Sequence, residues 1–335
     1  MARSRVYVTR RLPAPAMERL AEAADVATWP DDDYPPPRDV LVREAAASDG
    51  LVALVTDRID GALLDAAPRL RVVSNVAVGY DNIDVAAATA RGVVVTNTPG
   101  VLTETTADFA FALLLAAARR VAEADRFTRA GRWTSWGPLF FAGLDVHGRT
   151  LGLVGLGRIG TAVARRARGF AMHVVYYSRT RKPEVERELG LEYATLEELL
   201  PRADFVSIHV PLSAQTRHLI GAPQLRLMKP TAILVNTSRG AVVDQRALYD
   251  ALVRRQIWAA GLDVFEEEPI APDDPLLALE NVVVAPHIGS ATVETRTKMA
   301  LMAVENCLAV LDDRPPPHPV NPEVWARRRE RRVGP

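Results

Sequence analysis

Three residues, each placed at the end of an apolar run, have side chains suited to acid–base chemistry on a small carboxylic acid. Arg239 follows AILVNTS, Glu268 lies near the end of GLDVFEEEP, and His287 lies in APHIGSAT. Imidazole exchanges a proton readily near neutral pH, so His287 is the candidate proton donor. A Glu268 carboxylate beside it would orient the ring and favour its charged form, and the planar fork of Arg239 suits a substrate carboxylate and would polarise the carbonyl.

Each of these residues also has a plainer interpretation. Arg239 would suit a structural ion pair, Glu268 is one of three consecutive acids that water would solvate, and His287 would suit a hydrogen-bonded position at a strand end. The carboxyl ends of parallel strands, however, converge on one crevice, where open sheets bind their ligands. The shared position of the three residues therefore favours the chemical interpretation.

A glycine-rich turn, GLGRIG, lies between the apolar run TLGLV and the helical stretch TAVARRARGF. Gly155 allows the tight turn, Gly157 lets the backbone approach a pyrophosphate, and Gly160 lets helix and strand pack closely. The anion would lie at the helix N-terminus. The alternative is that the glycines only punctuate a turn, but the strand before them and the helix after them match a dinucleotide site.

The end of the next apolar run, HVVYY, indicates which dinucleotide binds. An acid at this point would accept hydrogen bonds from the ribose hydroxyls and repel a 2′-phosphate. The chain has Ser178 there instead, followed by Arg179 and Arg181. Guanidinium groups suit phosphate, so this stretch predicts a preference for NADP(H), with NAD(H) also possible. The alternative is a solvated basic loop that accepts either cofactor.

Short β-branched runs alternate with helical stretches along the chain, which predicts α/β architecture with two doubly wound parallel-sheet domains. The first series contains RVYVT, LVALVT, RVVSNV and GVVVTN, and the second contains six runs from TLGLV to NVVVAPHIG. One long helix is expected from Thr103 to Gly131, and another over 292–311 that returns to the first domain. We therefore expect residues 1–100 with 290–321 as one discontinuous domain, 101–289 as the dinucleotide-binding domain and 322–335 as a tail.

Composition favours a small-molecule partner over a nucleic acid or a membrane. The 335 residues are 48% hydrophobic with a formal net charge of +0, so the balance of charge indicates no large basic surface. The N-terminus lacks the apolar segment of a signal peptide, and the longest apolar run, FAFALLLAAA, is too short to span a bilayer. The single cysteine, Cys307, excludes a disulfide or a thiolate metal site within the chain and fits a reducing, cytoplasmic setting. The terminal ARRRERR is expected to be a solvated face.

NTSRGAVVD, GLDVFEEEP and APHIGSAT, in this order after GLGRIG, resemble the D-isomer-specific 2-hydroxyacid dehydrogenase family over nearly the whole chain, to about Asn321. VAVGYDNID, GRWTSW and YYSRTRKPE are similar to its glyoxylate/hydroxypyruvate reductase branch. The resemblance implies a flavodoxin-like substrate-binding domain, a Rossmann-type cofactor domain, an active site in the cleft between them and a homodimer formed through the cofactor domains. It also implies hydride transfer from the nicotinamide to glyoxylate or hydroxypyruvate, with His287 as the proton donor.

The resemblance also carries over further binding residues. The backbone amides of Val78 and Gly79 would bind the substrate carboxylate together with Arg239, and Leu54 would line the pocket. Trp136 resembles a tryptophan that reaches the neighbouring subunit's pocket and limits substrate size, the alternative being an ordinary interface aromatic. The cofactor residues implied are Thr106, Gly155, Leu156, Gly157, Arg158, Ile159, Gly160, Ser178, Arg179, Arg181, Thr237, Ser238 and Asp263.

Two other functions compete with this interpretation. A 3-phosphoglycerate dehydrogenase, or another D-2-hydroxyacid dehydrogenase, would share the motifs, but the former is expected to add basic residues for the substrate phosphate and often a regulatory domain after Asn321. A nucleotide-sensing corepressor would share the fold, but it would not need Arg239, Glu268 and His287 together.

Overall fold

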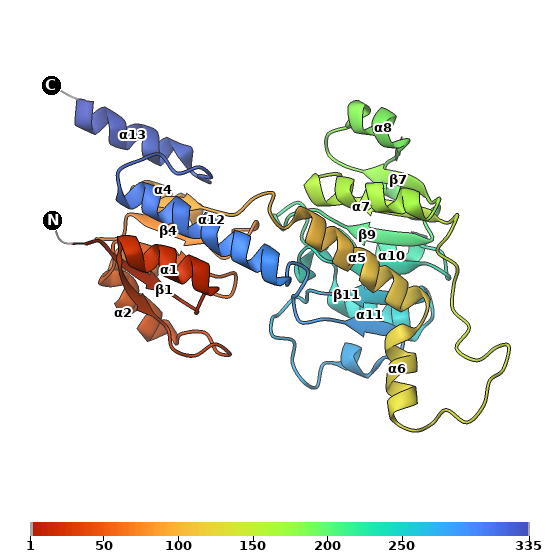
Figure 1. The fold of residues 1–335 in the computed structure, drawn as a ribbon. Helices are drawn as coiled ribbons and strands as arrows, with labels where there is room; N and C mark the ends of the chain where they lie inside the picture. Colours follow the sequence, from red (N-terminus) through yellow and green to blue (C-terminus); the bar gives the residue numbers. More distant parts are fainter. Residues whose placement is uncertain (1–2, 334–335) are drawn as a thin grey trace. The chain divides into compact units, whose positions relative to one another are not determined.

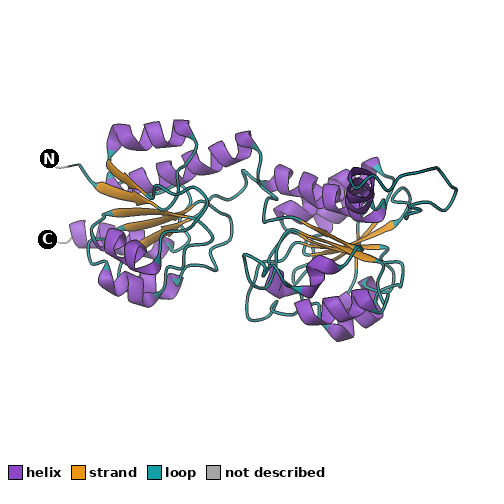
Figure 2. Cartoon of the chain, turned by 90° about the horizontal axis from the view of Figure 1, so that it is seen from below, coloured by secondary structure: helices purple, strands orange, loops and turns teal. Residues whose placement is uncertain are grey.

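The structure is a computed structural model that describes residues 3–333, with side chains described up to residue 327. The chain divides into two compact units. The first combines the residues up to Leu102 with those from Thr292 onward, and the second is Thr103–Ala291. Each unit is a parallel sheet with helices on both faces (Figure 2), so the predicted fold class is confirmed.

The first unit contains a five-stranded sheet in the order β2-β1-β3-β4-β5, which is the flavodoxin-like order. Its strands are β1 (Arg5–Val8), β2 (Asp25–Thr28), β3 (Gly50–Ala53), β4 (Val72–Asn75) and β5 (Val94–Thr96). Four of these were predicted. The edge strand β2 was not, because its sequence DVAT is partly exposed and contains no apolar run.

Five helices cover the first sheet. Helices α2 (Arg38–Ala46), α3 (Gly61–Ala66) and α4 (Val85–Ala90) lie on one face and share a hydrophobic core with it. On the other face, α1 (Ala14–Ala23) and the long α12 (Val293–Leu311) lie side by side (Figure 1). The predicted return of α12 to the first unit is therefore confirmed, and its buried Cys307 is part of that packing.

Residues Pro322–Val333 form helix α13, where the sequence predicted only a tail. Asn321 anchors the start of this helix, because its buried side chain accepts a hydrogen bond from Val95 N at 2.8 Å and donates one to Val93 O at 3.0 Å. Pro322 then occupies the first helical position, where its missing N–H costs nothing. The expected solvation of ARRRERR concerns side chains that lie mostly outside the described residues.

The second unit contains a seven-stranded parallel sheet in the order β12-β11-β10-β9-β6-β7-β8. The six predicted strands are confirmed, and the additional β8 (Glu192–Tyr193) is a two-residue edge strand too short to be recognised by pattern. The order extends the dinucleotide-binding arrangement by one strand, with its switch point between β6 and β9. The other strands are β6 (Thr150–Val154), β7 (His173–Tyr177), β9 (Phe205–Ile208), β10 (Ile233–Asn236), β11 (Ala259–Leu262) and β12 (Val282–Val284).

The helices of the second unit pack against its sheet and against one another. Helix α5 packs on β10 and β11 beside α7, and α10 and α11 pack together (Figure 1). Within residues 3–333, no helix combines the length and the apolar character needed to cross a bilayer. The helices are α5 (Thr103–Ala118), α6 (Val121–Arg129), α7 (Arg158–Gly169), α8 (Pro183–Leu189), α9 (Leu196–Leu199), α10 (Ala222–Leu227) and α11 (Gln245–Val253), with 3₁₀ turns at Gly240–Val242 and Pro275–Ala278.

The single long helix predicted from Thr103 to Gly131 is wrong, because the structure divides it into α5 and α6. Arg120 adopts a left-handed backbone with φ of 54° between them. The chain then returns past the end of α5, where Leu144 N donates to Ala118 O at 2.9 Å. A Cβ on Gly143 would lie 2.2 Å from that same oxygen, so only glycine allows this approach. A tertiary contact thus ends a helix that local propensity would continue.

Candidate active site

The glycine turn follows β6 at the switch point of the sheet. Gly155 has a φ of +104°, and a Cβ there would lie 2.8 Å from His209 O, at the end of β9. A Cβ on Gly160 would lie 2.2 Å from Gly155 O, so helix α7 packs directly on the turn. Gly157 differs, because a Cβ there would meet nothing within 4 Å. The first and third glycines are therefore required by the protein itself, whereas the second borders open space.

These features fit a dinucleotide. No side chain caps the N-terminus of α7, whose N-cap is Gly157, so its amides are available to a phosphate. After β10, Thr237 Oγ1 is buried and has no hydrogen-bond partner among the described residues. Such a group usually has a partner, which a bound ligand would supply. Five other predicted cofactor residues in this unit are buried Thr106 and Leu156, half-buried Ile159 and Ser238, and exposed Arg158.

The loop after β7 places Ser178 and Arg179 at the carboxyl end of that strand. Ser178 is half-buried and Arg179 is exposed, with no ion-pair partner in the described part of the chain. Arg181 is different: its Nη2 lies 2.9 Å from Glu186 Oε2, in α8. The sequence prediction grouped the two arginines, but the structure places only Arg179 where it has no competing carboxylate.

The turn after β10 positions Arg239. Buried Asn236 ends the strand. Its side-chain Nδ2 donates to Arg239 O at 2.9 Å, and its side-chain Oδ1 accepts from Ser238 N at 3.0 Å. The next residue, Gly240, lies against the loop after β11, since a Cβ there would be 1.8 Å from Phe265 C. The Arg239 turn is thereby locked to the segment that leads to Glu268.

Glu268 and His287 meet across the ends of β11 and β12. His287 Nδ1 lies 2.6 Å from Glu268 Oε2, and Glu268 Oε1 accepts from Phe265 N at 3.0 Å. Burial would raise the pKa of the Glu268 carboxyl, but the hydrogen bond and charge of His287, with a contribution from Arg239, bring the pKa below its usual value. Glu268 is therefore an acceptor at neutral pH, which places the proton of this hydrogen bond on Nδ1, and Nε2 has no hydrogen-bond partner among the described residues.

Asp263 holds the backbone on which His287 is presented. His287 adopts a left-handed φ of 55°, a backbone conformation that is uncommon outside glycine. Its N–H donates to Asp263 O at 2.9 Å, and the Asp263 carboxylate accepts from Ile288 N at 2.7 Å and Gly289 N at 2.8 Å. Burial raises the pKa of Asp263, and the two amides oppose that shift. The conformation of the loop that carries His287 therefore depends on the hydrogen bonds that its backbone amides donate to Asp263, the residue directly after β11.

Three of the residues predicted to bind substrate lie at strand ends of the first unit. Leu54 follows β3 and is half-buried, and Val78 and Gly79 follow β4. The carbonyls of Val78 and Gly79 accept from the side chains of Asn97 and Asn75, at 2.8 and 2.9 Å. Among the described residues, neither amide N–H has an acceptor. This turn thus offers two adjacent donors, as anion binding requires.

Trp136 lies on the long loop between α6 and β6. Its side chain is 80% exposed, and the same loop carries Trp133 at 61% and Leu139 at 85%. Nothing in the described residues of this chain covers these apolar side chains. Trp136 is therefore not packed into the interior of its own unit.

Sequence reasoning missed Asn236, Glu186 and the desolvation of His209. An asparagine that ends an apolar run is a signal for a side-chain-closed turn, so Asn236 was recognisable in NTSRG. His209 is half-buried beside the glycine turn, where its Nε2 lies 2.9 Å from Ser207 Oγ, and desolvation lowers its pKa to about 4. No local pattern indicated that Glu186 would pair with Arg181.

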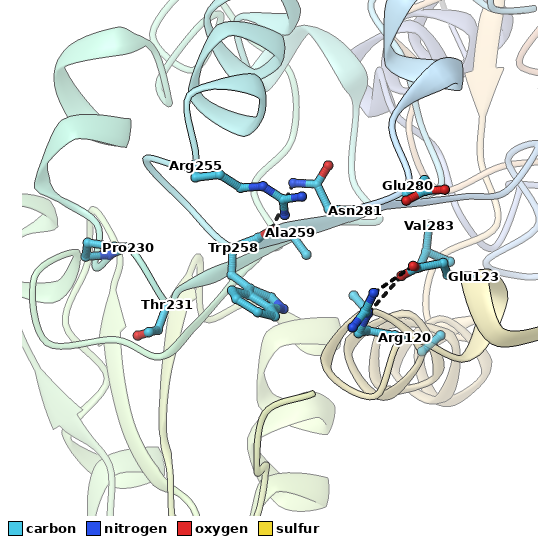
Figure 3. A pocket seen from close by; sticks show the side chains of 12 residues that line it. Arg120, Glu123, Pro230, Thr231, Arg255, Trp258, Ala259, Glu280, Asn281 and Val283 are labelled. Carbon is cyan, nitrogen blue, oxygen red and sulfur yellow. Dashed lines mark hydrogen bonds and ion pairs between the residues drawn. The ribbon is translucent and has the colours of Figure 1, made fainter. Parts of the chain in front are cut away.

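A separate pocket of about 580 Å³ lies near the amino-terminal ends of strands β10, β11 and β12 of the second sheet, whereas the predicted catalytic residues follow the carboxyl ends (Figure 3). It is lined by residues that precede β10, β11 and β12, including Thr231, Trp258 and Asn281, and by the Arg120–Glu123 ion pair at the start of α6. None of the predicted site residues lines it. In the described part of the chain, no group of His, Cys, Asp and Glu side chains could hold a metal ion. The candidate chemistry therefore remains at the carboxyl ends of the strands.

Comparison with known proteins identifies related chains. The sequence model for the NAD binding domain of D-isomer specific 2-hydroxyacid dehydrogenases matches residues 111–289. A glyoxylate reductase of Korarchaeum cryptofilum is 59% identical over 321 residues, 96% of each chain, and one of Aeropyrum pernix is 55% identical over 97% of this chain and 98% of its own. An NADPH-dependent glyoxylate/hydroxypyruvate reductase of Sinorhizobium meliloti, solved with NADP and malonate, superposes with a TM-score of 0.82 at 37% identity over 95% of this chain and 97% of its own.

Proposed function

The chain belongs to the D-isomer specific 2-hydroxyacid dehydrogenase family, and on this premise we propose that it reduces glyoxylate to glycolate and hydroxypyruvate to D-glycerate, with NADPH preferred over NADH. The observation that carries the proposal is the 2.6 Å hydrogen bond between His287 Nδ1 and Glu268 Oε2 at adjacent strand ends. It orients a proton-bearing imidazole and leaves its other nitrogen for the substrate. Relatives of 50–59% identity named glyoxylate reductase support the substrate class.

The division of labour among the residues follows from their positions. When bound, the nicotinamide supplies the hydride that adds to the carbonyl carbon. His287 gives its proton to the carbonyl oxygen, and Glu268 stabilises the charged ring before the transfer. Arg239 binds the carboxylate of the keto acid and polarises its carbonyl. In the first unit, which acts as the substrate-binding domain, the backbone amides of Val78 and Gly79 bind the substrate carboxylate and Leu54 lines the pocket.

The cofactor proposal depends on the loop after β7. Ser178 carries no charge to repel a 2′-phosphate, and exposed Arg179 offers a guanidinium that no described carboxylate neutralises. The Sinorhizobium meliloti relative, which is NADPH-dependent, supports this preference. The phosphates would lie on the turn at Gly157 and the N-terminus of α7, and Thr237, Ser238 and Asp263 would contact the nicotinamide end.

We place the enzyme in the cytoplasm as a homodimer. The exposed Trp133, Trp136 and Leu139 support an interface through the loop that follows α6, with Trp136 entering the partner's substrate pocket. The single Cys307 is buried, and burial raises its thiol pKa to about 12, which suits a chain without disulfides. Size-exclusion chromatography with light scattering measures the oligomeric state, and a monomer at micromolar concentration would contradict this part of the proposal.

The decisive experiment is the oxidation of NADPH and NADH by the purified protein with glyoxylate, hydroxypyruvate, phosphohydroxypyruvate and pyruvate. We expect the first two substrates to be reduced fastest and NADPH to give the lower KM. The variant His287→Ala should lower kcat at least about 100-fold, because positioned acid catalysis typically contributes that much or more. Turnover of phosphohydroxypyruvate alone would indicate a phosphoglycerate dehydrogenase, and no turnover with any of the four would contradict the enzymatic role.

A further inference from the structure

Arg181 and Glu186 form a two-point ion pair beside the predicted 2′-phosphate site. The Nε of Arg181 lies 2.9 Å from Glu186 Oε1, and its Nη2 lies 2.9 Å from Oε2. The guanidinium also lies over the ring of Tyr193, 5.6 Å from its centroid. Arg181 therefore has a carboxylate on one side and an aromatic face on the other, and its charge is largely compensated within the protein.

Glu186 is itself held by the core of the second unit. The hydroxyl of buried Tyr176 donates to Glu186 Oε1 at 2.5 Å and accepts from Lys182 N at 2.8 Å. The Glu186 side chain is only 11% exposed. Arg181 first, and Tyr176 next, lower the pKa of Glu186, so it stays a carboxylate at neutral pH. Tyr176, in strand β7, thus fixes the position of the Glu186 carboxylate in the ion pair.

We propose that Glu186 is a specificity-determining residue for the cofactor, because it withholds Arg181 from the 2′-phosphate. Recognition of that phosphate then falls on Ser178 and Arg179, and the preference for NADPH is limited by a residue that touches neither nucleotide. The inference rests on the proposed use of NADPH. Its physical basis is that the carboxylate neutralises Arg181, so that the pair presents no net positive charge to a dianionic phosphate.

The substitution Glu186→Gln tests this directly, since glutamine keeps an acceptor for Tyr176 and removes the charge. We expect the Kd for NADP⁺, measured by isothermal titration calorimetry, to fall about fivefold, a size typical of one unit charge acting on a phosphate through partly exposed surroundings. The Kd for NAD⁺ should change less than about twofold, because NAD⁺ carries no 2′-phosphate. The matched control is Glu184→Gln, which removes one exposed charge from the same helix without breaking an ion pair; it should change the ratio of the two Kd values less than about twofold.

A double-mutant cycle assigns the gain to Arg181. Arg181→Gln alone is not informative because it leaves the Glu186 carboxylate unpaired, so the deciding arm is the double variant: in the Glu186→Gln background, Arg181→Gln should abolish the gain. The inference is overturned if Glu186→Gln leaves the ratio of the Kd values unchanged or weakens NADP⁺ binding, or if the gain persists when Arg181→Gln is added to Glu186→Gln. The proposed NADPH preference is tested separately by Arg179→Gln, which should weaken NADP⁺ binding about tenfold or more and spare NAD⁺; equal effects on both would refute the preference itself.

Discussion

The contact of Gly240 with the loop after β11 makes a sharp prediction about how Arg239 is positioned. In the substitution Gly240→Ala, the new Cβ would lie 1.8 Å from Phe265 C, 1.9 Å from Phe265 O and 2.4 Å from Glu266 N. All three are backbone atoms, so no side-chain rotation can relieve the clash. The turn that carries Arg239 must therefore move away from the segment that leads to Glu268.

The size of the effect follows from these distances. Ordinary carbon contacts begin near 3.4 Å, so the two segments must separate by roughly 1.5 Å, at a cost of about 3 kcal/mol, the upper end for overpacking. In a unit of this size that corresponds to a fall in Tm of about 6–12 °C. A displacement of about 1 Å in a substrate-positioning residue typically costs about 100-fold in rate, so we expect kcat/KM for glyoxylate to fall by about that factor.

Two measurements check this prediction: steady-state kinetics with glyoxylate and calorimetric unfolding. The control is Gly169→Ala in α7, where a Cβ would meet nothing within 4 Å and helix propensity favours alanine. It should keep full activity and an equal or higher Tm. If Gly240→Ala retains kcat/KM within about threefold and Tm within about 2 °C of the parent, then this contact does not position Arg239 and the reasoning is refuted.

Three further predictions address other parts of the molecule. Glu268→Gln should replace a charge-assisted hydrogen bond to His287 by a neutral one, a loss of about 1.5 kcal/mol that lowers kcat/KM about tenfold; activity equal to that of the Glu267→Gln control would contradict the role of the charge. Trp136→Ala should raise kcat/KM for keto acids larger than hydroxypyruvate several-fold relative to glyoxylate, and an unchanged ratio would show that this tryptophan does not limit substrate size. Burial lowers the pKa of His209 to about 4, so the unfolded chain binds this proton first and stability is lost as the pH falls from about 6.5 towards 4, by about 2 kcal/mol between pH 7 and 5. Urea denaturation of His209→Gln should lack that loss, and a pH dependence like that of the parent would show that another group causes it.

Much of the fold was predictable because its determinants are local. Runs such as RVVSNV and AILVNTS are strands in the structure, and GLGRIG opens a helix, because β-branched alternation and glycine turns act over a few residues. The predictions that failed concern elements whose structure depends on a segment distant in the sequence. The edge strands β2 and β8 depend on a neighbouring strand for their hydrogen bonds, and the break between α5 and α6 depends on the later approach of Gly143 to Ala118.

The same distinction applies to the candidate site. The order of residues along the chain was enough to predict that an arginine, a glutamate and a histidine follow three strands, since parallel strands present their carboxyl ends at one edge of the sheet. It also determined that no acid follows β7. The three-dimensional structure was needed to show that His287 takes a left-handed backbone and lies 2.6 Å from Glu268, and that Arg181 pairs with Glu186 while Arg179 does not. The physical reason is that hydrogen bonds and ion pairs require fits of a few tenths of an ångström, which the packing of separate strands and helices sets and local sequence patterns do not.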